Sequence, residues 1–415
     1  MEVSKSKEWT VKDEAILREE WGNGMAIRDI AGLLGRTPKS VERKIAGLGL
    51  EARSAAPKPP RNVDKADYWK QQYKRVSDML EEERWKKTEV EALIEEASAM
   101  APMSYAVAPQ VKWPTKRKGS PQSAVLLLSD THVGQVVDAD QTLGFGGYSI
   151  EIFLQRLKRL EQAVYSILHD HVTTPVEELV VPMLGDMLHG NLSHAVEAGQ
   201  KHTLFEQHFV AAHALAQFLR NVAALVPKVR IYTTVGNHTR WGTQRKMPTD
   251  NRYSNLDQFT YALIQSLTRD VKGIQWRLDK QPYAMFQVQG YQFYCGHGDN
   301  LRGGDKALGI PSHSIGRGMA STMGLRAKAG QPLVNYYCFG HLHKPIQIPH
   351  TLGEVIVNGG FPGVDGYGLA EGFQAYWPSQ KFFLVHPKFG RAACYDLRLD
   401  FAPEGDQTYN IPTIE

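Results

Sequence analysis

Metal-binding side chains follow five separate apolar segments of this chain, and together they could hold two divalent cations. The five groups are Asp130-Thr131-His132, Gly185-Asp186-Met187-Leu188-His189, Gly236-Asn237-His238, Gly296-His297-Gly298 and Gly340-His341-Leu342-His343. Their donors are carboxylate, imidazole and amide oxygen, with no thiolate in the set. Such donors suit borderline or hard ions such as Mn²⁺, Fe²⁺ or Zn²⁺.

Each group comes directly after a short run of apolar, β-branched or aromatic residues. The runs lie at 125–128, 179–184, 229–235, 293–295 and 336–339. Short runs of this composition are typical of buried strands rather than of helices. We therefore expect every group of ligands to stand at the end of a strand.

In this order, the D-x-H, G-D, G-N-H, G-H and G-H-x-H motifs resemble the calcineurin-like metallophosphoesterase superfamily. The resemblance covers roughly Ser123 to Leu399. It implies an α/β fold in which two mixed β-sheets are sandwiched between helices, with the metal site on loops at one edge. A small all-α domain of three helices and a long helix are expected to precede this fold.

The resemblance also implies which residues hold which metal. The two groups of three ligands would be Asp130, His132 and His343 for the first metal, and Asn237, His297 and His341 for the second. Asp186 would bridge both metals, because a carboxylate has two oxygens that can each face one cation. Two cations held in this way can activate a water and grip the phosphate oxygens of an ester.

His238 follows the Asn237 ligand, and the resemblance implies that it gives a proton to the leaving oxygen without binding metal. An imidazole titrates near neutrality and suits that role. The family usually has Asp or Glu at the next position, where this chain has Thr239. Either His238 is less efficient here, or another group such as His132 or Asp186 supports it. His189 is expected beside the site without being a ligand.

The composition is that of a globular protein with more than one domain. Of the 415 residues, 42% are hydrophobic and 22% are charged, which gives ample length for a large core. No apolar run reaches the length of a membrane span, and the polar N-terminus lacks an apolar signal segment. Three cysteines, Cys295, Cys338 and Cys394, argue against a disulfide framework. We expect a cytoplasmic protein without a membrane partner.

A first domain is predicted at residues 1–54, with three short helices. Thr10 and Thr37 are predicted N-caps, the second followed by a proline in the first turn. The helices joined by residues 34–37 resemble a helix-turn-helix of the Myb/SANT-like kind. The residues expected at the major groove are Lys39, Ser40, Arg43 and Lys44. Because basic residues concentrate on this helix, DNA is favoured over the alternative, a helical bundle that docks a protein.

Residues 55–122 are predicted to be a linker that contains one long helix at 64–99. Its apolar residues recur at a three-four spacing that Glu83 and Lys87 interrupt. The pattern fits a coiled coil that forms a homodimer, and equally a helix that packs on the catalytic domain. That domain is predicted at 123–415, with helices at 150–171, 203–225 and 256–269 and later strands at 283–288, 291–295, 354–357, 382–385 and 392–399.

The segment after Gly298 is rich in glycine and in basic residues. We expect a mobile loop there that forms a basic lid against a polyanion. Its predicted contacts with nucleic acid are Arg302, Arg317 and Arg326.

Three functions fit these features. The segment from Gly185 to His189 resembles the G-D-x-x-H of the superfamily's double-strand-break repair nucleases, and the protein-phosphatase pattern G-D-x-x-D-R-G is absent. Together with the helix-turn-helix, this favours a two-metal phosphodiesterase that is a DNA nuclease, with Mn²⁺ as the expected ion. The alternatives are a phosphatase or phosphodiesterase for nucleotides or phosphoproteins, and a DNA-binding adaptor whose activity is weak because of Thr239.

Overall fold

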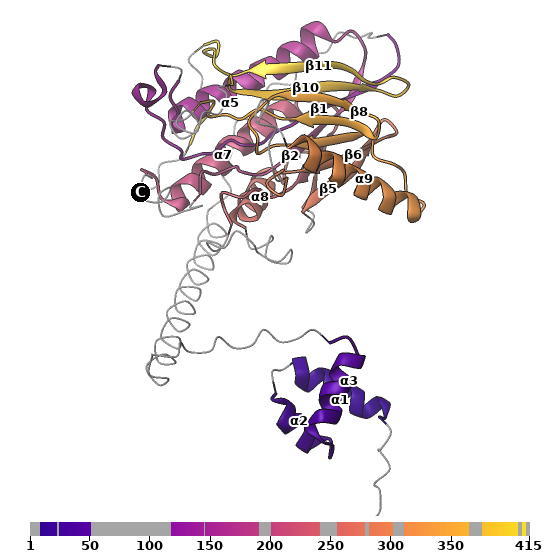
Figure 1. The fold of residues 1–415 in the computed structure, drawn as a ribbon. Helices are drawn as coiled ribbons and strands as arrows, with labels where there is room; N and C mark the ends of the chain where they lie inside the picture. Colours follow the sequence, from indigo (N-terminus) through magenta and orange to yellow (C-terminus); the bar gives the residue numbers. More distant parts are fainter. Residues whose placement is uncertain are drawn as a thin grey trace, which may run out of the picture. The chain divides into compact units, whose positions relative to one another are not determined.

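The computed structural model describes residues 9–22, 25–50, 118–144, 146–190, 201–240, 255–278, 282–301, 311–364, 376–405 and 409–411. These residues belong to two units, an N-terminal helical one and a larger α/β one, which are described separately (Figure 1). The predicted helix at 64–99 lies outside the described residues, and so does the homodimer contact expected from it.

Three short helices form the N-terminal unit: α1 (Val11–Gly22), α2 (Ile27–Leu33) and α3 (Pro38–Gly47). Both predicted N-caps are confirmed, because Thr10 Oγ1 accepts the N–H of Asp13 at 3.1 Å and Thr37 Oγ1 accepts the N–H of Ser40 at 3.3 Å. The helices meet around a small apolar core that contains Leu17, Ile30, Ala31, Leu34, Val41 and Ile45.

Two mixed β-sheets form the α/β unit, as predicted. The first has the strand order β11-β10-β1-β2-β3-β4 and the second the order β5-β6-β7-β9-β8. The strands are β1 (Gln122–Leu126), β2 (Val176–Met183), β3 (Val229–Thr233), β4 (Ile274–Arg277), β5 (Tyr283–Val288), β6 (Tyr291–Gly296), β7 (Tyr336–Phe339), β8 (Ile346–His350), β9 (Gly353–Val357), β10 (Ser379–His386) and β11 (Gly390–Arg398). Strands β1, β2, β3 and β4 pair in parallel, and so do β6, β7 and β9.

The two sheets face each other, and helices cover their outer sides (Figure 1). Along β1, Val125 packs between the sheets, whereas Ala124 and Leu126 face the helices, because successive strand residues point to opposite faces. The first sheet is covered by α5 (Ile150–Ser166), α7 (Leu204–Ala223) and α8 (Leu256–Leu267), and the second by α9 (Ser312–Lys328). A 3-10 turn, η1 (Ala139–Thr142), and a π-helical turn, η2 (Ile167–His171), complete the described helical elements.

The segment after Gly298 is only partly as predicted. Residues 302–310 lie outside the described part of the chain, and Arg302 with them. Residues 312–328 form α9 instead of a mobile loop, because Ile315 and Met319 provide an apolar stripe that packs on the second sheet. Strands β4 and β8 were also missed by the sequence prediction. Within the described residues, no helix is both long and apolar enough to cross a membrane.

Acid is expected to weaken this fold through His208, which lies in α7 with 2% of its surface exposed. Burial lowers the pKa of His208 from 6.5 to about 3. The unfolded chain therefore binds this proton as the pH falls below 6.5, whereas the folded chain does not until about pH 3. The stability that the neutral imidazole confers is complete above the unfolded pKa and is lost progressively as the pH falls towards the folded one.

Between about pH 7 and pH 4, the free energy of unfolding of the wild type should fall by about 3 kcal/mol more than that of a His208→Gln variant. Urea unfolding followed by circular dichroism at each pH measures this difference. His313→Gln, which removes an exposed imidazole of α9, is the control and should follow the wild-type curve. Parallel curves for the wild type and His208→Gln would contradict the assignment.

Candidate metal centre

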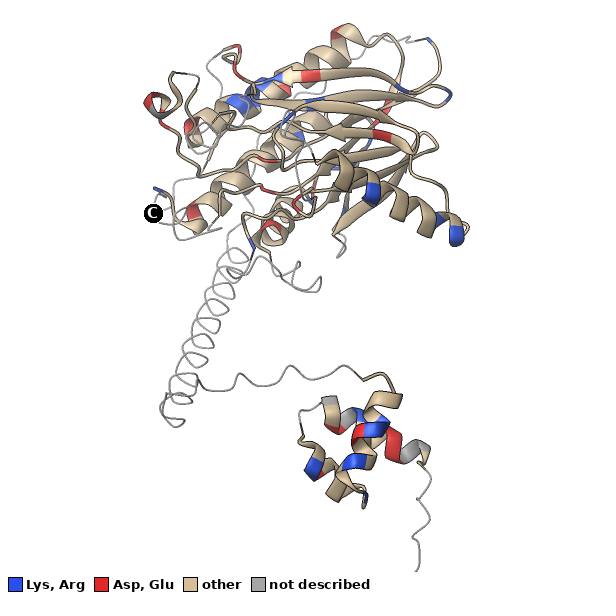
Figure 2. Ribbon diagram, in the orientation of Figure 1, with Lys and Arg blue, Asp and Glu red and all other residues tan. Residues whose placement is uncertain are grey.

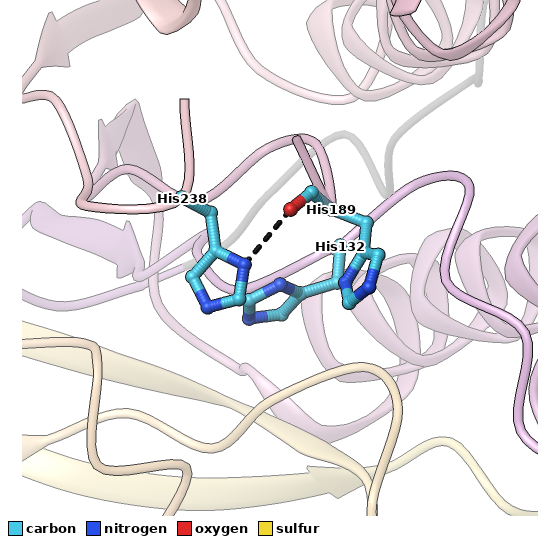
Figure 3. Close-up of side chains that lie close together, drawn as sticks. All are labelled: His132, His189 and His238. Atoms are coloured by element: carbon cyan, nitrogen blue, oxygen red, sulfur yellow. Dashed lines mark hydrogen bonds between the residues drawn. The ribbon is translucent and has the colours of Figure 1, made fainter. Parts of the chain in front are cut away.

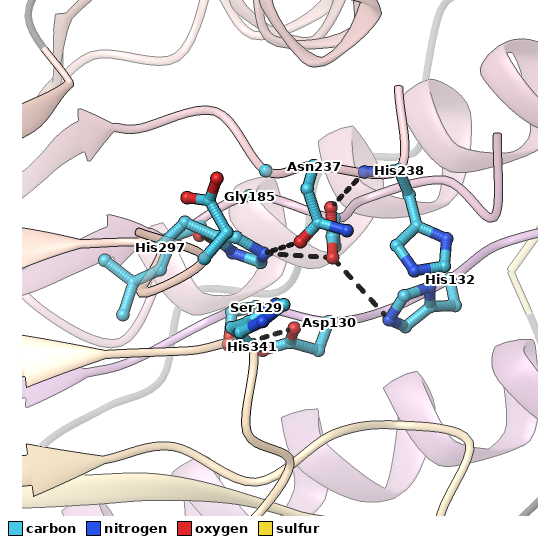
Figure 4. A network of polar contacts seen from close by, with 12 residues as sticks. Ser129, Asp130, His132, Gly185, Asn237, His238, His297 and His341 are labelled. Carbon is cyan, nitrogen blue, oxygen red and sulfur yellow. Dashed lines mark hydrogen bonds and ion pairs between the residues drawn. The ribbon is translucent and has the colours of Figure 1, made fainter. Parts of the chain in front are cut away.

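The predicted metal ligands lie on loops that leave the carboxyl ends of parallel strands (Figure 4). The loops after β1, β2 and β3 carry Asp130, His132, Asp186, Asn237 and His238, and those after β6 and β7 carry His297, His341 and His343. Parallel neighbours end at the same edge of a sheet, so the topology gathers side chains that are far apart in sequence. Both sheets contribute to the same site.

The backbone at these loops is unusual, because five of the predicted ligands have a positive φ. The angles are 54° at Asp130, 43° at His132, 54° at Asp186, 65° at His341 and 51° at His343. In the described part of the chain only two other non-glycine residues share this left-handed conformation. Such positions cost free energy and are typical of functional sites, where the surrounding structure holds them.

A first group of ligands contains Asp130, His132 and His343, whose donor atoms lie within 4.8 Å of one another. Nε2 of His343 is 3.2 Å from Oδ1 of Asp130 and 3.1 Å from Nε2 of His132. Both oxygens of Asp130 accept the backbone N–H of His341, at 3.0 and 3.1 Å. Asp130, a ligand of the first group, therefore fixes the backbone of His341, a ligand of the second group.

His132 is held differently from the other rings. Its Nδ1 is buried and has no hydrogen-bond partner in the part of the chain that the structure describes. Its ring instead packs edge-on against His238 and His343, with centroids 4.4 and 5.0 Å away. Neighbouring imidazoles therefore set the orientation of this ligand.

A second group contains Asp186, His297 and His341, again within 4.8 Å. Nε2 of His297 lies 3.0 Å from Oδ2 of Asp186 and 2.9 Å from Oδ1 of Asn237. Nδ1 of His297 donates to the carbonyl of Leu184 at 2.7 Å, which directs Nε2 into the site. A backbone partner behind the ligand is the usual way in which proteins fix a metal-binding imidazole.

Asp186 lies between the two groups. Its Oδ2 is 3.0 Å from Nε2 of His297 and 4.0 Å from Nε2 of His132. Its Oδ1 accepts the backbone N–H of His238 at 2.9 Å. One carboxylate thus faces both groups of histidines, as the bridging role requires.

Charge and burial in this site favour a bound cation. Burial alone would lower the pKa of His297, but the Asp186 carboxylate more than offsets it and raises that pKa to about 9. Burial lowers the pKa of His341 to about 4, so this ring is neutral at pH 7. A positive charge is thus held beside Asp186 by a proton on His297, at a place where a divalent cation can replace it. The donor set therefore fits two divalent metal ions.

His238 lies beside His132 and His189, and the three rings form a third group of the described residues whose ring nitrogens could hold a metal ion (Figure 3). Nδ1 of His238 donates to the backbone carbonyl of His189 at 2.8 Å, which leaves Nε2 for other chemistry. Thr239 cannot orient the ring, because its hydroxyl donates to Oδ1 of Asn255 at 2.7 Å. The backbone carbonyl of His189, and not the side chain of Thr239, therefore orients the ring of His238.

Close backbone contacts explain the glycines that precede the ligands. A Cβ on Gly236 would lie 2.0 Å from Oδ1 of Asp186, and one on Gly340 would lie 2.6 Å from Oδ2 of Asp130. Neither oxygen can move without disturbing a ligand. Glycine is therefore required at both positions by the approach of one loop to the next.

The sequence analysis missed Asp257, a fully buried residue in the first turn of α8. Its Oδ2 accepts the N–H groups of Asp186 at 3.0 Å and Gly236 at 2.8 Å, and its Oδ1 accepts that of Met187 at 3.2 Å. One carboxylate thus ties the loop of the bridging aspartate to the loop of Asn237. Burial, with the nearby Asp186 charge, raises the pKa of Asp257 to about 6.

Asn255 and Tyr261 support the same two loops. The side-chain amide of Asn255 donates to the carbonyl of Gly236 at 2.9 Å, and the hydroxyl of Tyr261 accepts the N–H of Gly185 at 3.1 Å. An asparagine before a helix and an aspartate in its first turn are ordinary capping residues. Their local sequence therefore gave no sign of this second role.

An Asp257→Asn variant is expected to bind metal about 10- to 100-fold more weakly. The amide group turns one acceptor into a donor, so it opposes at least one of the three N–H groups and loosens both loops. Isothermal titration with Mn²⁺ measures the loss. Asp270→Asn is the matched control, because Asp270 pairs with Arg220 away from the ligands. Equal metal affinity for Asp257→Asn and the wild type would refute the positioning role.

The residues expected to contact nucleic acid are on helices, not on the loops that carry the candidate metal ligands. Lys39, Ser40, Arg43 and Lys44 are on α3 of the N-terminal unit. Arg317 and Arg326 are on α9, where Arg317 is exposed and Nε of Arg326 donates to the carbonyl of Pro332 at 2.5 Å.

No protein-family model matches this chain, and no curated protein is significantly similar to it in sequence. Among solved structures, it is similar to an archaeal phosphodiesterase, with 12% identity and a TM-score of 0.29, over 63% of this chain and 92% of that one. It is also similar to a predicted phosphoesterase of Streptococcus pneumoniae TIGR4, with 9% identity and a TM-score of 0.28, over 69% and 95%. Wild-type Vps29 of Entamoeba histolytica, complexed with zinc, has 10% identity and a TM-score of 0.27, over 67% and 99%.

The described residues form an α/β unit with two mixed sheets, in which Asp186 faces both carboxylate-containing groups of candidate metal ligands.

Proposed function

We propose that the α/β unit is a two-metal phosphodiesterase and that its substrate is DNA. The observation that carries the proposal is the pair of ligand groups that Asp186 faces through His132 and His297, with the ring of His238 beside them. Two divalent ions in such a site supply electrostatic stabilisation of a phosphoryl group and lower the pKa of a bound water. Little else is then required of the protein beyond positioning and proton transfer.

The residues of the chain divide these tasks. The left-handed loops hold Asp130, His132 and His343 at fixed positions, so the ligands do not have to reorganise when the substrate arrives. His238 keeps its Nδ1–H on the carbonyl of His189, and its Nε2 can carry the proton that the leaving oxygen needs. Burial of Asp186 and His297 excludes water from the inner part of the site.

Mn²⁺ is the ion that we propose first, with Fe²⁺ and Zn²⁺ as the other choices. The donors are imidazole nitrogens and carboxylate or amide oxygens, which suit these borderline ions. Cys295 and Cys338 are buried within β6 and β7 and are not among the candidate ligands of the described residues. Soft-metal chemistry therefore has no support in this site.

DNA is the proposed substrate because the chain also carries a helical unit with a basic third helix (Figure 2). Lys39 and Arg43 of α3 are exposed, one helical turn apart, and so are free to meet phosphates or base edges. Lys44 is held at 2.5 Å from Glu14 of α1, and Ser40 is only half exposed. We therefore assign the main DNA contacts of this unit to Lys39 and Arg43.

Digestion of supercoiled, linear and single-stranded DNA by the purified protein tests the function. A panel of divalent ions, with nucleotides and bis-p-nitrophenyl phosphate as competing substrates, should give DNA cleavage with Mn²⁺ at the top of the series. Cleavage of the small ester without cleavage of any DNA would favour the nucleotide or phosphoprotein alternative. Inactivity towards every ester, with retained DNA binding, would favour the adaptor.

Replacing Lys39 and Arg43 together by alanine should weaken binding to duplex DNA. The number of phosphate contacts, obtained from the salt dependence of the binding constant, should fall by about two. Fluorescence anisotropy at several salt concentrations measures both quantities. The matched control replaces Arg18 and Arg28, two exposed arginines of α1 and α2, by alanine. The assignment fails if both double variants lose affinity equally, because only net charge would then matter.

A further inference from the structure

Two large, exposed aromatic rings contact one arginine near the start of β10 and the end of β11. Trp377 is 57% exposed and Phe401 is 54% exposed. The guanidinium carbon of Arg398 lies over both rings, 4.3 Å from the centroid of Trp377 and 5.0 Å from that of Phe401. Exposed rings of this size leave apolar surface in water, which is unfavourable unless something binds there.

Asp400 fixes the geometry of this aromatic cluster. It forms a two-pronged ion pair with Arg398, in which Nε lies 3.0 Å from Oδ1 and Nη2 contacts Oδ2. The carboxylate holds the guanidinium group against both rings and offsets its charge. The cluster of Trp377, Arg398 and Phe401 is therefore a preformed stacking surface rather than a simple basic patch.

The aromatic cluster is connected to the metal centre by short contacts. Trp377 lies two residues before Ser379, whose N–H donates to the carbonyl of Gly360 at 3.1 Å. Gly360 lies directly against the ring of His343, because a Cβ there would be 2.9 Å from its Cγ. The next residue, Phe361, donates its N–H to the carbonyl of Asp130 at 2.9 Å.

A second contact makes the connection on the other side of Trp377. Its neighbour Tyr376 lies under the ammonium group of Lys344, which is 5.3 Å from the ring centroid. Lys344 directly follows the ligand His343. Two cation–ring contacts thus adjoin along the chain, Lys344 with Tyr376 and Arg398 with Trp377 and Phe401.

This combination of exposed rings and cations fits a single-stranded nucleic acid. Unpaired bases offer flat faces that stack on aromatic rings, while their phosphates favour nearby cations. The bases of a duplex are already stacked on one another and cannot use such a surface. A folded protein partner would favour an apolar surface around the rings, whereas here both rings contact the charged Arg398, which is paired with Asp400.

We propose that the Trp377–Arg398–Phe401 cluster binds the bases of a single-stranded segment whose backbone enters the metal centre. The inference rests on the proposed nuclease function and narrows its substrate to DNA with an unpaired segment. Because Asp400 offsets the charge of Arg398, stacking rather than ion pairing dominates at this cluster. Its contribution to affinity therefore depends little on salt.

Oligothymidylate binding to the metal-loaded full-length protein tests the proposal, by fluorescence anisotropy at low temperature with recovery of intact oligonucleotide as a check. Trp377→Ala with Phe401→Ala should weaken this binding roughly ten- to a hundredfold and leave duplex affinity almost unchanged. Trp377→Phe should retain most of the affinity, because a ring remains. Phe389→Ala is the matched control, since Phe389 is 68% exposed on the turn between β10 and β11. Thermal unfolding of each variant verifies its fold.

Photo-crosslinking of an iodouracil-substituted oligonucleotide gives a second measurement that does not depend on a variant. The crosslinked peptide should contain Trp377 or Phe401. Crosslinks confined to other peptides, or equal oligothymidylate affinity for the wild type and the double alanine variant, would overturn the inference while DNA cleavage by the wild type still stands. Absence of any cleavage by the wild type would instead remove the proposed function.

Discussion

Asp186→Asn is expected to reduce the number of tightly bound metal ions from two to at most one and to lower hydrolysis by roughly a thousandfold or more. The amide keeps the size of the side chain, and it can still accept the N–H of His238 through its oxygen. Its NH₂ group then faces His297 and His132, where a carboxylate oxygen stood. A neutral donor at that place cannot bind two cations.

Metal content by mass spectrometry and rates on bis-p-nitrophenyl phosphate measure the two effects. Asp140→Asn, the same change at an exposed position of η1, should retain both ions and the full rate. Two ions bound to Asp186→Asn with wild-type affinity would show that the carboxylate does not bridge them.

His238→Gln is expected to keep both metal ions and to lose about 10²- to 10⁴-fold in turnover. The group of His132, His189 and His238 contains no carboxylate, so we expect both ions to be held by the groups of Asp130 and Asp186 and to remain bound in this variant. The loss should be largest for DNA, whose leaving alkoxide needs a proton. It should be much smaller for a p-nitrophenyl ester, whose leaving group is stable as an anion.

His189→Gln separates the ring of His189 from its backbone. The bond that orients His238 comes from the carbonyl of His189, so this substitution should leave most of the turnover intact. Steady-state rates at saturating Mn²⁺ on both substrates provide the comparison. Equal losses on DNA and on the p-nitrophenyl ester for His238→Gln would contradict proton donation.

The sequence predicted the strands and the helices next to the ligands well, because each has a clear local pattern. The strands predicted at 283–288 and 291–295 are confirmed as β5 and β6, joined by a turn at Gln289 and Gly290, and the helix predicted from 203 is α7, which begins after Thr203 with a capping box. α9 was missed because its glycines suggested a loop, whereas packing of Ile315 and Met319 on the second sheet outweighs their low helix propensity.

The ligand positions could be predicted from motifs, but their support could not. Asp257 lies 71 residues after Asp186, and only the fold brings its carboxylate to the backbone of that loop. The group that orients His238 is the backbone carbonyl of His189, which every residue type has at that position. Contacts made by backbone atoms across distant loops leave no pattern in a single sequence.

The division of the ligands between the sheets has a thermodynamic consequence. Asp130 and His132 come from the first sheet and His343 from the second, while Asn237 and His297 are divided in the same way. An ion at either position would therefore be bound by residues of both sheets and would link the two sheets. Its binding would raise the free energy of unfolding by about 2.7 kcal/mol when the free ion concentration is a hundred times the dissociation constant. Removal of the ions by a chelator would then weaken the packing of the two sheets on each other, and it would also stop the reaction.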